Sequence, residues 1–281
     1  ERIAKISEQL KKSVNCALRV NPDIAIGSHK YIETGSKTSK FGLDSEAVNK
    51  ISDEARDNKL VNITSVACHI GSQISDENLI LKSLDVISEI ANNLSLNGHA
   101  IKFLDIGGGL GIQYKDEEEG DPGILMAGVK NRLEGKEYKI ILEPGRSIIG
   151  TAGILVTRIE YIKNAGGKKF AIIDAGMNDL IRPSLYEAWH EVKELENKEI
   201  SSDTYDLAGP VCETGDILAK DRNLKILPND FVAFMDVGAY GSVMSSNYNS
   251  RLKPMELLVM DGEIEVIRRK ETFEDLIALE S

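Results

Sequence analysis

Hydrophobic positions in the first 150 residues alternate between short continuous apolar runs, typical of buried strands, and longer segments with helical periodicity. The apolar runs lie at 14–20, 63–70, 103–106 and 138–142, and the helical segments at 1–10, 45–58, 76–94 and 124–133. Ser45 is the expected N-cap of the second helix. Strands that alternate with helices favour parallel strands joined by crossover helices, so we expect an α/β unit over residues 1–150.

From about Gly153 the pattern changes to short strand-like runs that are separated by turn residues. The runs lie at 154–162, 169–173, 205–207, 230–235, 255–260 and 263–267, and a closing helix is expected at 271–280. This spacing is typical of a mostly antiparallel β domain. We expect such a domain over residues 151–281.

Polar residues stand at the carboxyl ends of the predicted strands of the first unit. They are Arg19, His69, Gly107 to Gly109, and Glu143 with Arg146. In an α/β barrel this edge of the strands carries the site. A complete barrel needs eight strands over about 250 residues, and only half of them are visible here. Since the chain also begins without methionine in a helical pattern, we expect it to lack the first half of a barrel.

Three consecutive glycines, Gly107 to Gly109, end the apolar run at 103–106. Glycines remove side chains from a turn and expose N–H groups, which can bind a phosphate, most strongly where a helix begins directly behind them. The dinucleotide pattern G-x-G-x-x-G fails because its last position is Ile112. On these residues alone, a phosphate cradle and a tight turn without a ligand are equally open.

The composition of the chain limits the kinds of ligand and the cellular setting that we expect. The net charge of −11 and the pI near 5.0 argue against nucleic acid as a ligand. No apolar run approaches the roughly 20 residues of a membrane span, and no signal peptide is visible. The cysteines Cys16, Cys68 and Cys212 are widely spaced, which indicates neither a disulfide framework nor a zinc site. A reducing, cytoplasmic setting fits this composition best.

A set of short motifs in one order carries a family resemblance. They are His69-Ile-Gly-Ser-Gln73, Gly107-Gly-Gly-Leu-Gly111, Glu143-Pro-Gly-Arg146, Arg182-Pro-Ser-Leu-Tyr186, Gly209-Pro-Val-Cys-Glu-Thr-Gly-Asp216 and Gly238-Ala-Tyr-Gly241. The set resembles the pyridoxal-phosphate (PLP) decarboxylases with an alanine-racemase-type barrel, and among them the diaminopimelate decarboxylases. This resemblance implies an α/β plus β fold: the C-terminal half of a PLP-binding TIM (β/α)8 barrel, then a mostly antiparallel β-sandwich or barrel domain.

The resemblance assigns PLP contacts to one set of residues: His69, Ser72, Gly107, Gly108, Gly109, Glu143, Gly145, Arg146 and Tyr240. In this family His69 would stack on the pyridine ring, and Glu143 would keep the ring nitrogen protonated so that the ring accepts electrons from Cα. On the residues alone, His69 is as well explained as a plain polar residue. Glu143 is likewise explained by an ion pair with Arg146, although Pro144-Gly145 argues against a helix there.

The resemblance also assigns the substrate to Arg146, Arg182, Tyr186, Glu213 and Tyr240. A planar guanidinium suits a bidentate carboxylate contact. Cys212 would donate a proton to the carbanion, which makes Cys212, His69 and Glu143 the expected catalytic residues. In the family Cys212 and Glu213 reach the site from the neighbouring subunit, which implies a homodimer. A buried structural role stays open for Cys212, and Cys16 and Cys68 are expected to pack in strands.

Two features depart from the family pattern. Leu252 stands where proline usually follows Tyr248-Asn-Ser-Arg251, and no lysine matches the one that holds PLP as a Schiff base. Lys40 belongs to another motif, and Lys102 opens a strand. The expected activity is decarboxylation of meso-diaminopimelate to L-lysine and CO₂. An ornithine-, arginine- or carboxynorspermidine-type decarboxylase and a non-catalytic PLP-binding fragment or homologue are the alternatives.

Overall fold

The computed structural model describes residues 1–25 and 40–280 of the chain. These residues form two compact units, Glu1–Ile148 and Ile149–Ser281. Each unit has its own hydrophobic core. No helix among the described residues is long and apolar enough to cross a membrane.

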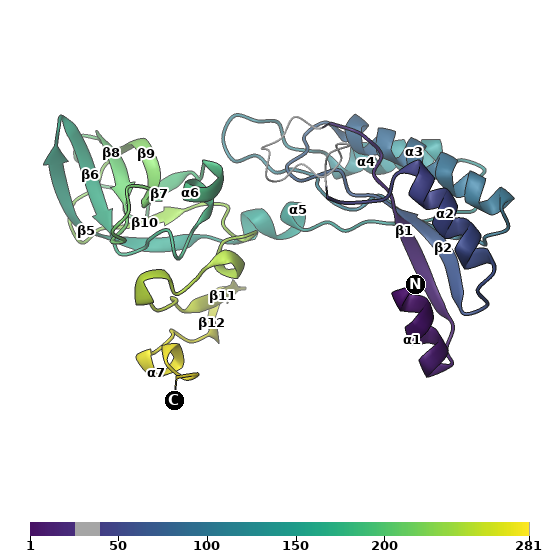
Figure 1. The fold of residues 1–281 in the computed structure, drawn as a ribbon. Coiled ribbons are helices and arrows are strands. Elements are labelled where there is room, and N and C mark those ends of the chain that lie inside the picture. The colour runs from purple at the N-terminus through teal and green to yellow at the C-terminus, as the bar shows by residue number, and fades with distance from the viewer. Residues whose placement is uncertain (26–39, 281) are drawn as a thin grey trace. The chain divides into compact units, whose positions relative to one another are not determined.

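The first unit is a parallel sheet whose strands follow one another in chain order (Figure 1). Its strands are β1 (Val14–Arg19), β2 (Val61–Ala67), β3 (Phe103–Asp105) and β4 (Lys139–Ile141). The connecting helices are α1 (Arg2–Leu10), α2 (Ser45–Arg56), α3 (Glu77–Leu96) and α4 (Pro122–Arg132), and the single turn α5 (Arg146–Ile149) follows β4. The parallel α/β arrangement predicted from the apolar runs is therefore confirmed.

Leu104 of β3 lies at the centre of this sheet. It pairs with Val66 of β2 on one side and with Ile140 of β4 on the other, and it is fully buried. One face of α3 adds Ile87 and Leu84 to the same core. Burial of such a side chain contributes about 1.5–3 kcal/mol, so the core holds the carboxyl ends of the strands in register.

Aspartates cap the helices α2, α3 and α4. Asp44 precedes α2 and accepts a hydrogen bond from the Ala47 N–H at 2.8 Å, whereas Ser45 lies inside the helix. The prediction of Ser45 as the N-cap is therefore wrong by one residue. An ionised carboxylate next to the first turn also interacts favourably with the helix dipole, which a serine hydroxyl does less well.

The second unit contains a six-stranded sheet in the order β7-β10-β5-β6-β8-β9 (Figure 1). Its strands are β5 (Leu155–Ala165), β6 (Lys168–Ile173), β7 (Val192–Glu194), β8 (Asp203–Ala208), β9 (Ile217–Leu224) and β10 (Phe231–Phe234). Only β6 and β8 pair in parallel, so the prediction of a mostly antiparallel domain is confirmed. The sequence pattern missed β7 and β9, because polar residues such as Asp221 and Arg222 interrupt the apolar alternation of β9.

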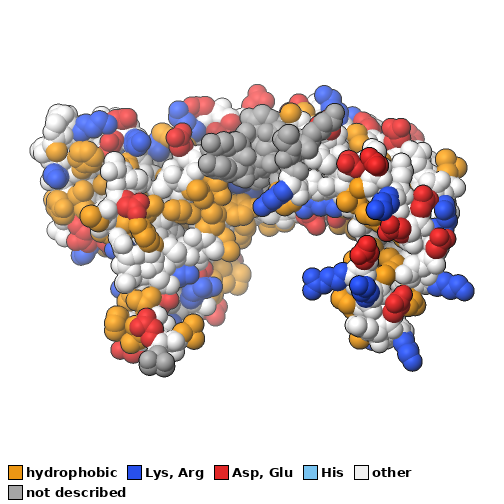
Figure 2. All heavy atoms as spheres, viewed as in Figure 1, with side chains coloured by type: hydrophobic (Ala, Val, Ile, Leu, Met, Phe, Trp, Pro, Cys, Tyr) orange, Lys and Arg blue, Asp and Glu red, His pale blue; other side chains and the backbone are white. Residues whose placement is uncertain are grey.

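A separate hairpin and a short helix close the chain. The hairpin pairs β11 (Glu256–Met260) with β12 (Glu263–Arg268), and apolar side chains lie on its surface (Figure 2). The predicted closing helix is a single turn, α7 (Phe273–Leu276). It begins with a capping box between Thr272 and Asp275. The rest of the stretch 271–280 is not helical in the structure.

Candidate active site

Three strand ends bring the predicted cofactor residues of the first unit together. His69 follows β2, Gly107 follows β3, and Glu143 follows β4. The Gly108 N–H donates to Nδ1 of His69 at 3.3 Å, and the Glu143 N–H donates to the Gly107 carbonyl at 2.8 Å. The expectation that these residues meet at one edge of the sheet is therefore confirmed, while their chemical roles remain predictions.

The glycine loop has no room for side chains. A Cβ on Gly108 would lie 2.1 Å from the Glu143 carbonyl oxygen, and one on Gly109 would lie 2.2 Å from the Gly71 carbonyl oxygen. Gly107 has φ = +69°, a conformation that favours glycine. The loop therefore needs glycine for close backbone packing between the three strand ends.

Two N–H groups of the glycine loop are already hydrogen-bonded within the first unit and are not free for a phosphate. The Gly107 N–H donates to Oδ1 of Asp105 at 2.9 Å, and the Gly108 N–H donates to His69. The expectation that the turn leaves all of its N–H groups exposed is therefore wrong for these two. Asp105, the last residue of β3, shapes the turn because its side chain reaches back to the main chain two residues later.

No helix begins directly behind the glycine loop. Ile74 pairs with the loop instead: its N–H donates to the Gly109 carbonyl, and its carbonyl accepts from the Gly111 N–H, both at 2.9 Å. The next helix, α4, begins at Pro122 after Asp121, which caps it. The condition that a helix begins directly behind the loop is therefore not met, since the chain first pairs with Ile74, and α4 lies close to the predicted helix 124–133.

Arg146 is the buried cation at this edge of the sheet, with only 8% of its surface exposed. Its Nη2 donates to Oγ of Ser72 at 3.2 Å, which joins two predicted phosphate ligands. Its Nη1 donates to the hydroxyl of Tyr114 at 2.5 Å. Sequence reasoning missed Tyr114; the available signal was a single aromatic residue in an otherwise polar stretch next to the glycine loop.

We predict that Tyr114→Phe weakens PLP binding roughly tenfold, because a hydrogen bond to a charged group is lost beside a predicted phosphate ligand. Titration of the protein with PLP, followed by absorbance, measures the effect. Tyr138→Phe is the matched control, since the Tyr138 hydroxyl donates to Asn92 at 2.8 Å on the exposed surface. Equal affinities of the two variants would contradict a role for Tyr114.

Burial and neighbouring charges set the protonation states of the site. Burial, followed by the positive charge of Arg19, lowers the pKa of His69, and the carboxylate of Glu143 opposes this shift. The lowered pKa favours the neutral form of the His69 ring, and Nδ1 of this ring accepts the Gly108 N–H. Burial raises the pKa of Asp105, and the charge of Glu143 adds to this effect. Burial also raises the pKa of Cys68 to about 11, which fits the predicted packing role of that thiol.

The predicted substrate residues of the second unit lie on three segments. Arg182 and Tyr186 begin and end the single helical turn α6 (Arg182–Tyr186). Cys212 and Glu213 lie on the loop 209–216, and Tyr240 follows β10 with φ = +62°.

Cys212 is exposed, so the alternative of a buried structural cysteine is wrong. The Tyr248 hydroxyl donates to Oε1 of Glu213 and holds that carboxylate.

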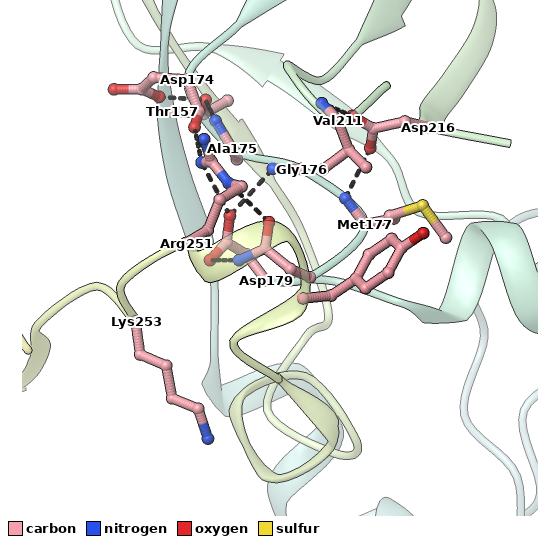
Figure 3. A network of polar contacts seen from close by, with 12 residues as sticks. Thr157, Asp174, Ala175, Gly176, Met177, Asp179, Val211, Asp216, Arg251 and Lys253 are labelled. Carbon is pink, nitrogen blue, oxygen red and sulfur yellow. Dashed lines mark hydrogen bonds and ion pairs between the residues drawn. The ribbon is translucent and has the colours of Figure 1, made fainter. Parts of the chain in front are cut away.

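Asp216 anchors the loop 209–216 (Figure 3). Its carboxylate is 2% exposed and accepts the Met177 N–H at 2.6 Å and the Val211 N–H at 2.7 Å. A Cβ on Gly209 would lie 2.3 Å from Oδ2 of Asp216, so the backbone packs directly on the carboxylate. The loop with Cys212 and Glu213 is therefore tied to the segment that follows β6.

Arg251 holds that same segment from its other side (Figure 3). Its Nη2 donates to the Asp174 carbonyl at 2.5 Å, and its Nε donates to Oδ1 of Asn178 at 2.8 Å. Oδ2 of Asp179 lies 3.6 Å from the guanidinium and accepts the Gly176 N–H. Asp216 and Arg251 thus fix the backbone of residues 174–179 between them.

Comparison with known proteins identifies the family. Residues 1–150 match the family described as "Pyridoxal-dependent decarboxylase, pyridoxal binding domain". The chain is 42% identical over 281 residues to the diaminopimelate decarboxylase of Pseudomonas aeruginosa, covering 100% of this chain and 68% of that protein. It is 44% identical over 275 residues to the enzyme of Aquifex aeolicus, covering 97% of this chain and 66% of that protein. The chain thus spans about two thirds of the length of these relatives.

Solved structures agree with the sequence comparison. The crystal structure of diaminopimelate decarboxylase from Helicobacter pylori complexed with L-lysine matches with a TM-score of 0.94 and 40% identity, over 99% of this chain and 70% of that one. An arginine decarboxylase of a Chlorella virus matches at 19% identity with a TM-score of 0.76, which shows the fold alone. The alternative of an ornithine- or arginine-type enzyme is therefore not favoured. The half-barrel followed by a β domain is confirmed, and the chain belongs to the diaminopimelate decarboxylase family of PLP-dependent enzymes.

Proposed function

We propose that the protein decarboxylates meso-2,6-diaminopimelate to L-lysine and CO₂ with PLP as cofactor. The observation that carries the proposal is the meeting of His69, the loop Gly107 to Gly109 and Glu143 at one sheet edge. The high identity to named diaminopimelate decarboxylases supports the choice of substrate. Residues 1–150 would serve the cofactor, and residues 151–281 would serve the substrate and the dimer interface.

The residues of the first unit fit the cofactor. Arg146 and Ser72 are joined and supply donors for a phosphate, with Gly145 in the turn before Arg146 and the side-chain-free glycine loop beside them. The neutral form of His69, which its lowered pKa favours, suits a ring that stacks on a pyridine. Glu143 would hold a proton at the pyridine nitrogen, and Tyr240 would add a further phosphate donor. When bound, PLP supplies a sink for the electron pair that is left on Cα when CO₂ departs.

The residues of the second unit fit an amino acid with charged groups at both ends. Arg182, with Tyr186 and Arg146, would bind substrate carboxylate, and Glu213 would bind the distal ammonium group. Cys212 would donate the proton of its Sγ to Cα after the bond to CO₂ breaks, so that the new Cα–H bond completes L-lysine. The exposed thiol and the Tyr248–Glu213 hydrogen bond support these roles.

We further propose a homodimer in which Cys212 and Glu213 complete the site of the neighbouring subunit. The exposure of Cys212 supports this arrangement, because a thiol at the surface is available to another chain. The three cysteines are all free, which supports a reducing, cytoplasmic location. Analytical ultracentrifugation of the full-length protein tests the dimer.

The activity is tested with purified full-length protein and PLP. We expect CO₂ release from meso-diaminopimelate, and its absence would refute the proposal. We predict that Arg182→Ala lowers kcat/KM on meso-diaminopimelate about a hundredfold, because a desolvated charged contact to the distal carboxylate is lost. Arg158→Ala is the control, since the Arg158 side chain is exposed on β5 and pairs there with Glu160. Preferred turnover of L-ornithine or L-arginine would favour the alternative.

A further inference from the structure

His190 lies directly against the guanidinium of Arg182. The Arg182 Nη1 atom is 2.8 Å from Nε2 of His190, and Nδ1 of the same ring is 2.8 Å from the Met235 carbonyl. His190 is fully buried, and Arg182 is 6% exposed. The ring therefore connects a predicted substrate ligand to the main chain just after β10.

The two contacts fix the protonation state of His190. A guanidinium has donors only, so Nε2 has to accept, and Nδ1 has to carry the proton that it donates to the Met235 carbonyl. A protonated ring has no acceptor and would lose the contact with Arg182. His190 therefore acts as a neutral acceptor with one defined tautomer.

The backbone around His190 is held independently of Arg182. Nη2 of Arg222 donates to the His190 carbonyl at 2.9 Å, and the Arg222 guanidinium lies over the ring of Trp189. The Met235 N–H donates to the Glu191 carbonyl at 2.9 Å. Because β9 and β10 fix the ring in this way, the position of the ring determines where the Arg182 guanidinium can lie.

We propose that His190 is a positioning residue that holds the Arg182 guanidinium in the orientation in which it binds the distal carboxylate of the substrate. This inference rests on the proposed function, which gives Arg182 that carboxylate. His190 itself does not touch the substrate in this proposal. Its loss should therefore weaken the binding of dicarboxylates and leave the chemical step largely intact.

A pair of variants separates the two contacts of the ring. His190→Asn keeps a donor near Nδ1 for the Met235 carbonyl and loses the acceptor for Arg182, whereas His190→Gln places an amide oxygen near Nε2 and keeps that acceptor. We expect His190→Asn to raise KM for meso-diaminopimelate roughly tenfold with kcat within about threefold of wild type. His190→Gln should stay within about threefold of wild type in both values.

A binding measurement without turnover supports the kinetics. Pimelate carries both carboxylates and no amino group, so its dissociation constant from the PLP-loaded protein can be measured by calorimetry. We expect this constant to rise roughly tenfold in His190→Asn. In an Arg182→Ala background, adding His190→Asn should cause no further change, because residues that act through one contact are not additive.

Several results would overturn the proposal. These are wild-type pimelate affinity in a folded His190→Asn variant, equal losses in His190→Gln and His190→Asn, or a further loss in the double variant. If the His190→Asn variant does not fold, the His190→Gln variant alone decides the question. Weak pimelate binding by folded His190→Gln would then overturn the proposal. If Arg182→Ala leaves the decarboxylation of meso-diaminopimelate unchanged, the proposed role of Arg182 fails instead.

Discussion

Replacing Gly108 with alanine is expected to weaken the binding of PLP at least about a hundredfold, an overpacking effect near 3 kcal/mol. The new Cβ would lie 2.1 Å from the Glu143 carbonyl oxygen, which is backbone at the end of β4 and cannot rotate away. The loop or the strand end must shift to make room. A shift of the loop would break the contact between Gly108 and His69, and a shift of the strand end would move Glu143 and Arg146, which follows it by three residues.

The cofactor content of purified protein, measured by absorbance after gel filtration, checks this prediction. Chemical denaturation of the same samples gives the accompanying loss of stability. Gly135→Ala is the control, because Gly135 has φ = +74° but a Cβ added there would meet nothing within 4 Å. The control variant has backbone strain but no steric clash. Near-normal PLP content in Gly135→Ala, together with low PLP content in Gly108→Ala, would therefore show that the clash in the glycine loop causes the effect. Normal PLP content in Gly108→Ala would contradict it.

The sequence predicted that His69, Gly107 and Glu143 meet at one edge of the sheet, because one physical rule decides it. Continuous apolar runs mark buried parallel strands, and the carboxyl ends of such strands meet at one edge. His69, Gly107 and Glu143 each follow a run of this kind, so their meeting needed no knowledge of distant contacts. This rule could not predict the path of the chain after Gly109, because that path depends on hydrogen bonds with Ile74, which lies far away in sequence.

The residues that hold the site residues in place could not be predicted from the sequence for the same reason. Tyr114 contacts Arg146 across 32 positions, and Asp216 contacts Met177 across 39 positions. A tyrosine or an aspartate in a loop looks like an ordinary exposed residue until the partner that buries it is known. His190 was hidden differently: it follows Arg182 by 8 positions, but the sequence pattern between them indicates only irregular chain.

The β domain illustrates the limit of apolar patterning. The buried guanidinium of Arg222 interrupts β9, yet this strand pairs along β8 and completes the sheet. Packing against Trp189 and the hydrogen bond to the His190 carbonyl offset part of the cost of burying that charge, although Nε and Nη1 of Arg222 are buried without a hydrogen-bond partner. A pattern of apolar residues cannot predict such a strand, since the contacts of the buried arginine are tertiary contacts.

Replacing Asp216 with alanine is expected to slow turnover strongly while the protein keeps its cofactor. The variant leaves the buried Met177 and Val211 N–H groups without their acceptor, at a cost of about 1–3 kcal/mol each. The loop 209–216 would then lose its tie to residues 174–179, and with it the positions of Cys212 and Glu213. Apart from Tyr240, the proposed cofactor contacts all lie in residues 1–148, and none of those contacts depends on this loop. We therefore expect kcat to fall about a hundredfold with PLP absorbance near that of wild type.

Asp206→Ala separates the loss of the loop from the general loss of a buried carboxylate. Asp206 is also buried; it accepts the Asp221 N–H at 2.8 Å and pairs with Lys168, and these partners lie on β9 and β6 and not in the loop. Both variants should lower the free energy of unfolding, and only Asp216→Ala should lower kcat when both are assayed well below their unfolding temperatures. Equal kcat values would mean that the loop keeps Cys212 in place without Asp216. A fall in kcat confined to Asp216→Ala would tie proton delivery to this one buried carboxylate, because the two variants differ in which backbone they release and not in the charge they remove.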